Sequence, residues 1–135
     1  AYVAALAGQY GVDLQILTNL TAERLAIQYN SARVCVYAPV MEPFGLVPLE
    51  AMACGTPVVG VREGGVQESV VNGETGILVA RDPVLFGEAV RYLFDNPKVA
   101  AEYGRNGREY VISRWTWDHS TAELEEYFQA FKRFR

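Results

Sequence analysis

Two glutamates stand on either side of a glycine in the most informative stretch of the sequence. Glu42 and Glu50 flank Gly45 in the segment E-P-F-G-L-V-P-L-E, which follows an expected strand and opens an expected helix. Gly45 lets another group approach the backbone closely, and the free amides of a helix start bind phosphate. Carboxylates accept hydrogen bonds from hydroxyl groups. The pattern predicts a ligand with hydroxyls on both sides of a phosphate or diphosphate, which is the layout of a nucleotide sugar.

Two other interpretations of this glutamate pair stay open on spacing alone. Glu42 in a solvated turn and Glu50 on the surface of an ordinary helix would need no function. The five residues of helix before Glu50 correspond to roughly 7 to 8 Å of rise, and the two carboxyl groups of an inverting glycosidase lie about 6.5 to 9.5 Å apart. The glycine-opened helix between the glutamates argues against a glycosidase.

Short apolar runs alternate with helical patterns along the chain. We expect strands at residues 13–17, 33–37, 57–61 and 76–79. This alternation predicts right-handed βαβ units with a parallel sheet, and therefore an α/β fold. A doubly wound fold of this kind binds its ligands outside the carboxyl ends of the strands, where segment 42–50 would lie.

Capping residues mark the expected helices. Thr21 caps one helix, Gly55 ends the helix that carries Glu50, and Asp82-Pro83 and Asn96-Pro97 each begin another. The last helix begins at about residue 117, and its apolar residues recur at helical spacing at Leu124, Tyr127, Phe128 and Phe131.

Composition limits the classes of partner. The formal charge of −4 and the pI near 5.0 argue against a nucleic-acid or anionic-membrane surface. No apolar run is long enough to span a bilayer, so we expect a cytoplasmic protein with no transmembrane segment. Cys35 and Cys54 lack metal-site spacing and are expected to be buried thiols, and the single histidine, His119, gives no zinc site.

Ordered motifs carry a resemblance to a known family. Residues 42–59 closely resemble the E-x7-E motif of retaining glycosyltransferases of the GT-B fold, the family often called glycosyltransferase group one. Residues 20–34 resemble the helix and strand before that motif. The segments 64–68 and 72–79 and the region around Trp115 follow in the family's order. The resemblance implies a Rossmann-like parallel sheet flanked by helices, in the C-terminal half of a GT-B enzyme.

The resemblance also implies roles for matching residues. Glu42 would bind the sugar hydroxyls beside the reacting carbon and is the implied catalytic residue. Glu50 would hold the ribose hydroxyls of the nucleotide. Backbone amides of Phe44, Gly45 and Leu46 would contact the sugar or its diphosphate, as the amides at a helix start do.

Further candidates for donor contact are Leu20, Gly64 and Gly65. Leu20 belongs to the loop that would lie near the nucleotide base, in which Thr18 replaces the glycine usual in the family. Gly64 and Gly65 equally suit a turn at the start of a helix, and we favour that structural role. We expect the tryptophans at 115 and 117 to pack rather than to form a sugar platform.

The implied reaction is transfer of a hexosyl unit from a nucleotide-diphosphate sugar to an acceptor hydroxyl, with retained configuration. No metal or other cofactor is expected, and the sequence has no D-x-D motif. The family's diphosphate-binding arginine and lysine would precede Ala1, and its N-terminal acceptor domain is missing from this sequence. We therefore expect residues 1–135 to be one truncated donor-binding domain, inactive alone, which self-associates through its last helix.

Three alternatives remain at this stage. A nucleotide-sugar epimerase or a phosphorylase of the same fold would share the donor site, and a non-catalytic module would bind the nucleotide sugar without turnover. The intact Glu42, Gly45 and Glu50 argue against such degeneration. A flavodoxin-like regulator is disfavoured because no acidic cluster ends the first expected strand. UDP, GDP and ADP are equally compatible with the sequence.

Overall fold

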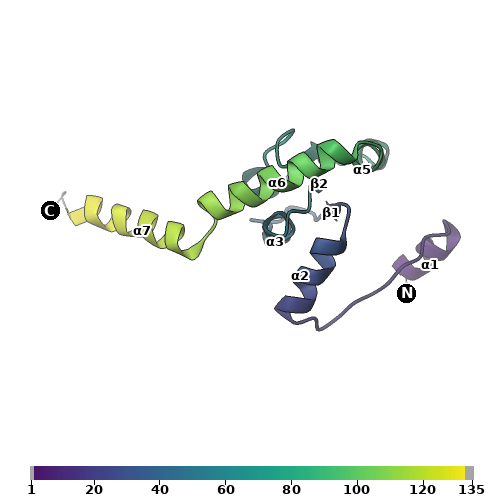
Figure 1. The fold of residues 1–135 in the computed structure, drawn as a ribbon, viewed down its shortest axis with the longest axis horizontal. Helices are drawn as coiled ribbons and strands as arrows, with labels where there is room; N and C mark the ends of the chain where they lie inside the picture. Colours follow the sequence, from purple (N-terminus) through teal and green to yellow (C-terminus); the bar gives the residue numbers. More distant parts are fainter. Residues whose placement is uncertain (1, 133–135) are drawn as a thin grey trace.

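A three-stranded parallel sheet forms the centre of the computed structural model, which describes residues 2–132 (Figure 1). Its strands are β1 (Cys35–Tyr37), β2 (Val58–Val61) and β3 (Gly76–Val79), in the order β1-β2-β3. Val58 of β2 lies opposite Cys35 on one side and Gly76 on the other. The parallel sheet confirms the predicted α/β fold, and three of the four expected strands form where the apolar runs placed them.

Helices cover both faces of this sheet, whereas the first and the last helix extend away from it (Figure 1). Among the described residues they are α1 (Tyr2–Gln9), α2 (Ala22–Ser31), α3 (Leu46–Ala53), α4 (Val66–Ser69), α5 (Pro83–Asp95), α6 (Pro97–Arg114) and α7 (Trp117–Lys132). The central strand β2 is buried along its whole length because both of its faces are covered. Val58 belongs to a core cluster with α3 and α4, and Val59 to a second cluster with Ala89 and Leu93 of α5.

The predicted helix boundaries are largely confirmed. The Thr21 hydroxyl accepts a hydrogen bond from the Arg24 amide at 3.4 Å, and the Asp82 carboxylate caps α5 by accepting from the amides of Val84 and Leu85. Asn96 begins α6 in a different way, because its side-chain amide donates backwards to the Tyr92 carbonyl at 2.9 Å. The predicted start of α6 at Asn96-Pro97 is therefore confirmed, although the Asn96 side chain does not cap the helix.

Helix α6 runs unbroken through the two glycines that weaken its sequence pattern. A Cβ on Gly104 would clash with the carbonyl oxygen of Gly55, and a Cβ on Gly107 would lie 3.0 Å from Cγ of Met52. Both glycines are buried and face α3 or the turn that ends it. They are required by the close packing of α6 on α3, which outweighs their low helix propensity.

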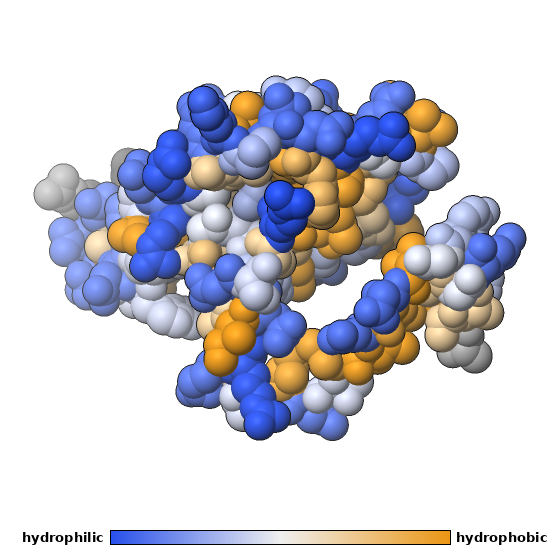
Figure 2. All heavy atoms as spheres, turned by 45° about the vertical axis from the view of Figure 1, so that its right-hand side comes forward, coloured by the Kyte–Doolittle hydropathy of each residue, from blue (hydrophilic) through white to orange (hydrophobic). Residues whose placement is uncertain are grey.

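The strand expected at residues 13–17 is wrong. These residues have no regular structure, and Ile16 is 69% exposed. A strand needs a hydrogen-bonded neighbour, and among the described residues β1 pairs on one side only, with β2. The N-terminal segment instead stands away from the main body across an open gap, with apolar side chains along part of its wall (Figure 2).

Helix α7 extends away from the sheet at the end of the described chain (Figure 1). It begins at Trp117, as expected, and its stripe of Leu124, Tyr127, Phe128 and Phe131 is 53% to 79% exposed. Trp115 is half-buried against the core, which confirms its packing role. Trp117 is 86% exposed, so a packing role is wrong for that residue. No helix within residues 2–132 has the length and hydrophobicity that crossing a bilayer requires.

The glycine contact between α6 and α3 can be tested by a matched pair of substitutions. Gly104→Ala is expected to lower the free energy of unfolding by about 1–3 kcal/mol, because the new methyl group must displace the Gly55 backbone. Gly87→Ala, in α5, meets no atom within 4 Å and is expected to raise stability by up to about 1 kcal/mol through helix propensity. Urea unfolding measures both, and an unchanged midpoint for Gly104→Ala would contradict the packing described.

Self-association of the chain through the exposed apolar stripe of α7 stays a prediction. Apolar side chains on one helix face gain free energy when a second copy covers them. Sedimentation at increasing concentration is expected to show a dimer that Phe128→Glu disrupts. A strict monomer at high concentration would count against it.

Candidate functional site

The loop between β1 and α3 carries Glu42 at the carboxyl end of the sheet. It runs over residues 38–45, and its middle residue Met41 adopts a left-handed backbone with φ of +50°. A non-glycine residue is held in this region only where its surroundings fix the loop. Glu42 itself is half-buried, whereas its neighbour Met41 is 71% exposed. The loop therefore keeps a defined shape beside solvent.

Gly64 and Gly65 hold this loop through the main chain. The Gly65 amide donates to the Glu42 carbonyl at 2.9 Å. A Cβ on Gly64 would clash with that same carbonyl, and a Cβ on Gly65 would clash with the backbone of Pro43 and Phe44. The glycine pair has the structural role favoured for it, through contact with the loop that carries Glu42 as well as at the start of α4. A contact of Gly64 or Gly65 with the donor stays a prediction.

Gly45 opens α3 in a conformation that suits glycine alone. It is buried, it is the N-cap residue of the helix, and its φ is +84°. Within residues 2–132, the backbone amides of Phe44, Gly45, Leu46 and Val47 donate to no protein acceptor. Unpaired amides at a helix start, with the positive end of the helix dipole, form an anion-binding site. The amides of Phe44, Gly45 and Leu46, which the sequence singled out, are thus free to bind a ligand, and their contact with a donor stays a prediction.

Glu50 lies on the exposed side of α3 and receives a hydrogen bond from α2. The Tyr29 hydroxyl donates to Oε2 of Glu50 at 3.1 Å. Burial, followed by the negative charge of Glu50 and this hydrogen bond, raises the pKa of Tyr29, so the phenol stays a donor at neutral pH. Because one carboxylate oxygen is engaged by Tyr29, the other is the natural acceptor for a ligand hydroxyl.

Glu42 also has a tyrosine beside it. Burial and, after it, the negative charge of Glu42 raise the pKa of Tyr37, the last residue of β1. The Tyr37 ring also lies 3.6 Å from the position that a Cβ on Gly45 would take. Each predicted carboxylate therefore has a protonated phenol beside it. Carboxylate oxygens accept hydrogen bonds from hydroxyl groups.

Leu20 is the predicted site residue that the structure does not bring to the others. It precedes the N-terminal end of α2, about nine residues or ~13 Å of helix rise from Tyr29, the α2 residue that reaches Glu50. Its contact with a nucleotide base stays a prediction. His119 is exposed on α7, and residues 2–132 contain no group of three His, Cys, Asp or Glu side chains placed to hold a metal ion.

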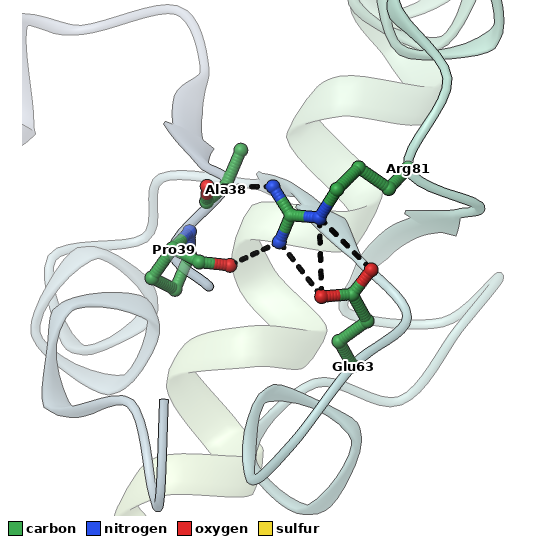
Figure 3. Close-up of polar contacts among 4 residues, drawn as sticks. All are labelled: Ala38, Pro39, Glu63 and Arg81. Carbon is green, nitrogen blue, oxygen red and sulfur yellow. Dashed lines mark hydrogen bonds and ion pairs between the residues drawn. The ribbon is translucent and has the colours of Figure 1, made fainter. Parts of the chain in front are cut away.

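Sequence reasoning missed the polar groups that support this site. Tyr29 and Tyr37 have ordinary helix and strand patterns, and only their positions across the fold connect them to the glutamates. Arg81 was also missed. Its guanidinium joins the loops that follow all three strands (Figure 3). One signal in the sequence could have pointed to Arg81. It stands between the expected strand 76–79 and the Asp82 cap of the next helix, which places it at the carboxyl edge of the sheet.

Comparison with known proteins decides the family. Residues 2–110 match the family described as glycosyl transferases group 1. The chain belongs to this family. It is 41% identical over 106 residues to a D-inositol 3-phosphate glycosyltransferase 2 of Catenulispora acidiphila, a match that covers 78% of this chain and 25% of that protein. The chain thus spans about a quarter of the length of its curated relative.

Solved structures show the same fold as this chain. Sucrose-phosphate synthase from Thermosynechococcus elongatus superposes with a TM-score of 0.83 at 33% identity, covering 98% of this chain and 34% of that one. Anabaena HepE in complex with UDP-glucose gives a TM-score of 0.81 at 19% identity, covering 96% and 36%. The C-terminal domain of a group 1 protein from Francisella tularensis gives 0.73 at 23% identity, covering 86% and 62%. This group 1 chain therefore has the α/β fold of a GT-B C-terminal domain.

The proximity of Cys35 to Glu50 gives a test of the site's electrostatics. Burial first, and then the charge of Glu50, raises the pKa of Cys35 to about 11. At pH 9 such a thiol is roughly 1% ionised, so alkylation is expected to be about 50-fold slower than in the urea-unfolded chain. Glu50→Gln is expected to lower the pKa of Cys35 and speed its alkylation, measured on a Cys54→Ser background. An unchanged pKa in Glu50→Gln would contradict the placement of Glu50.

Proposed function

We propose that this chain is the donor-binding part of a retaining glycosyltransferase that moves a hexosyl unit from a nucleotide-diphosphate sugar to an acceptor hydroxyl. One observation carries the proposal. The unpaired amides of residues 44–47 at the start of α3 lie between two carboxylates, Glu42 before the helix and Glu50 within it. A diphosphate suits the amides, and hydroxyl groups on its two sides suit the glutamates.

Each group then has a part in the reaction. Glu50, held by Tyr29, binds the ribose hydroxyls and fixes the nucleotide end of the donor. The helix-start amides at Gly45 and Leu46 stabilise the charge that the diphosphate gains as the sugar departs. Glu42 binds hexose hydroxyls beside the reacting carbon and stabilises the positive charge of an oxocarbenium-like transition state. No step in this scheme uses a metal ion.

The relatives support a hexosyl donor. The similar proteins are named as an inositol-phosphate glycosyltransferase and a sucrose-phosphate synthase, and HepE was solved with UDP-glucose. The chain spans only part of each of these proteins. We infer that acceptor contacts come from an N-terminal domain outside residues 1–135, and that residues 1–135 alone transfer no sugar. Leu20 keeps its proposed place near the nucleotide base.

Epimerases and phosphorylases of the same fold are separated by their products. Acceptor-independent epimerisation of a nucleotide sugar, or sugar release that requires phosphate, would indicate one of them. A non-catalytic binding module would bind the donor without either reaction. The complete set of Glu42, Gly45 and Glu50, each in a supported position, favours the transferase over that module.

Two substitutions divide the proposed site into its two ends. In the full-length protein, Glu50→Gln is expected to weaken binding of the nucleoside diphosphate by about tenfold or more, because a charged acceptor for the ribose is lost. Glu42→Gln is expected to lower kcat by at least about 100-fold with nucleoside diphosphate affinity within about threefold of wild type. Calorimetry and a transfer assay measure these effects.

The control for this pair is Glu88→Gln on the exposed side of α5, far along the chain from the site. It is expected to leave both quantities unchanged. Nucleotide binding that is insensitive to Glu50→Gln would exclude the donor geometry proposed here.

A further inference from the structure

Arg81, which follows β3, is the best-connected polar side chain among the described residues. Its Nε donates to both oxygens of Glu63 at 2.9 and 3.1 Å, and its Nη2 donates to Oε2 of Glu63 at 2.8 Å. Its Nη1 donates to the Ala38 carbonyl at 3.3 Å, and Nη2 also donates to the Pro39 carbonyl (Figure 3). The three loops that follow β1, β2 and β3 therefore meet at one guanidinium.

Two of these loops bear directly on Glu42. Ala38 and Pro39 begin the loop that carries Glu42, and Glu63 immediately precedes the glycine pair whose backbone packs on that loop. The loop is thus fixed at two points, by Arg81 at its start and by Gly65 at the Glu42 carbonyl. Val40 and Met41 between these points are 77% and 71% exposed, so their side chains add little packing.

We propose that Arg81 is a positioning residue for the reaction, because its guanidinium ties the Glu42 loop to the Glu63-Gly64-Gly65 loop and so sets the place of the Glu42 carboxylate. The proposal rests on the function proposed above. It assigns Arg81 no contact with the donor, since all three guanidinium nitrogens already have protein acceptors. A free arginine would bind the diphosphate as a cation, whereas this one binds the loops that surround it.

The pairing with Glu63 explains why an arginine is needed. The planar guanidinium engages the Glu63 carboxylate through two nitrogens and still reaches the two carbonyls of the β1 loop. A lysine ammonium is a point charge that cannot match this fork. The Arg81 guanidinium holds the pKa of Glu63 below its usual range, chiefly through their hydrogen bonds, so the pair stays ionised at neutral pH. An isolated surface ion pair contributes little, but this network ties backbone segments together.

The test compares Arg81→Met, Arg81→Lys and the control Arg91→Met in the full-length protein. Arg91 lies on the exposed side of α5, so Arg91→Met removes the same positive charge at a position outside the Arg81 network. Arg81→Met is expected to lower kcat by tenfold or more with UDP affinity within threefold, because Glu50 and the amides of Leu46 and Val47 belong to α3, which its buried residues hold in place without Arg81. Arg81→Lys is expected to recover only part of kcat. In a background lacking Arg81, Glu63→Gln is expected to add little further loss.

Hydrogen exchange of the peptide that spans residues 38–45 gives a readout independent of activity. Arg81→Met is expected to speed exchange there by tenfold or more, and Arg91→Met to leave it unchanged. Unchanged exchange, a kcat within twofold of wild type, or kcat and UDP affinity falling together with the folded fraction would each overturn the positioning role. If the wild-type protein transfers no sugar, the proposed function fails, and the exchange measurement still decides whether Arg81 fixes the loop.

Discussion

The main-chain contact of Gly64 and Gly65 with the Glu42 loop is the constraint on which the site depends. No side chain fits between these two segments, so the loop after β2 lies directly against the loop after β1. The hydrogen bond from Gly65 to the Glu42 carbonyl then fixes Glu42 relative to the sheet. Main-chain contacts of this kind vary less than contacts between long side chains, because they have no rotamers. The backbone that carries the predicted catalytic carboxylate is therefore held directly against the loop that follows β2.

Helix α3 fixes the position of Glu50 relative to Glu42. Leu49, Ala51 and Met52 are buried, and the glycines of α6 allow the two helices to approach closely. Glu50 follows and precedes buried residues in the sequence, but its own side chain lies on the exposed side of the helix. There the Tyr29 hydroxyl of α2 donates to its carboxylate. Helix α3 is packed into one core cluster, and it therefore sets the separation of the two glutamates. The unpaired amides at the start of the helix lie between the two glutamates. A ligand that contacts both glutamates and these amides must therefore carry its charged group in the middle.

The sequence predicted those features that follow from local patterns. Capping at Thr21 and Asp82, the three paired strands and the glycine-opened helix each depend on a few neighbouring residues. Residues 13–17 have the apolar pattern of a strand, but a strand also requires a partner, and periodicity carries no information about one. Tyr29, Tyr37 and Arg81 escaped prediction for a related reason. Each contact joins two different elements or loops, whose residues lie five positions apart for Tyr37 and Glu42, 21 for Tyr29 and Glu50, and 42 for Arg81 and Pro39.

The most direct test of the donor-site assignment is a crystal structure of the full-length protein with a bound nucleotide sugar. We predict that the diphosphate lies against the amides of residues 44–47, with the ribose hydroxyls on Glu50 and the hexose hydroxyls on Glu42. A donor bound elsewhere would contradict it. The clearest such location is the apolar hollow of about 390 Å³ that Ala38, Val61 and the start of α5 form beside Arg81.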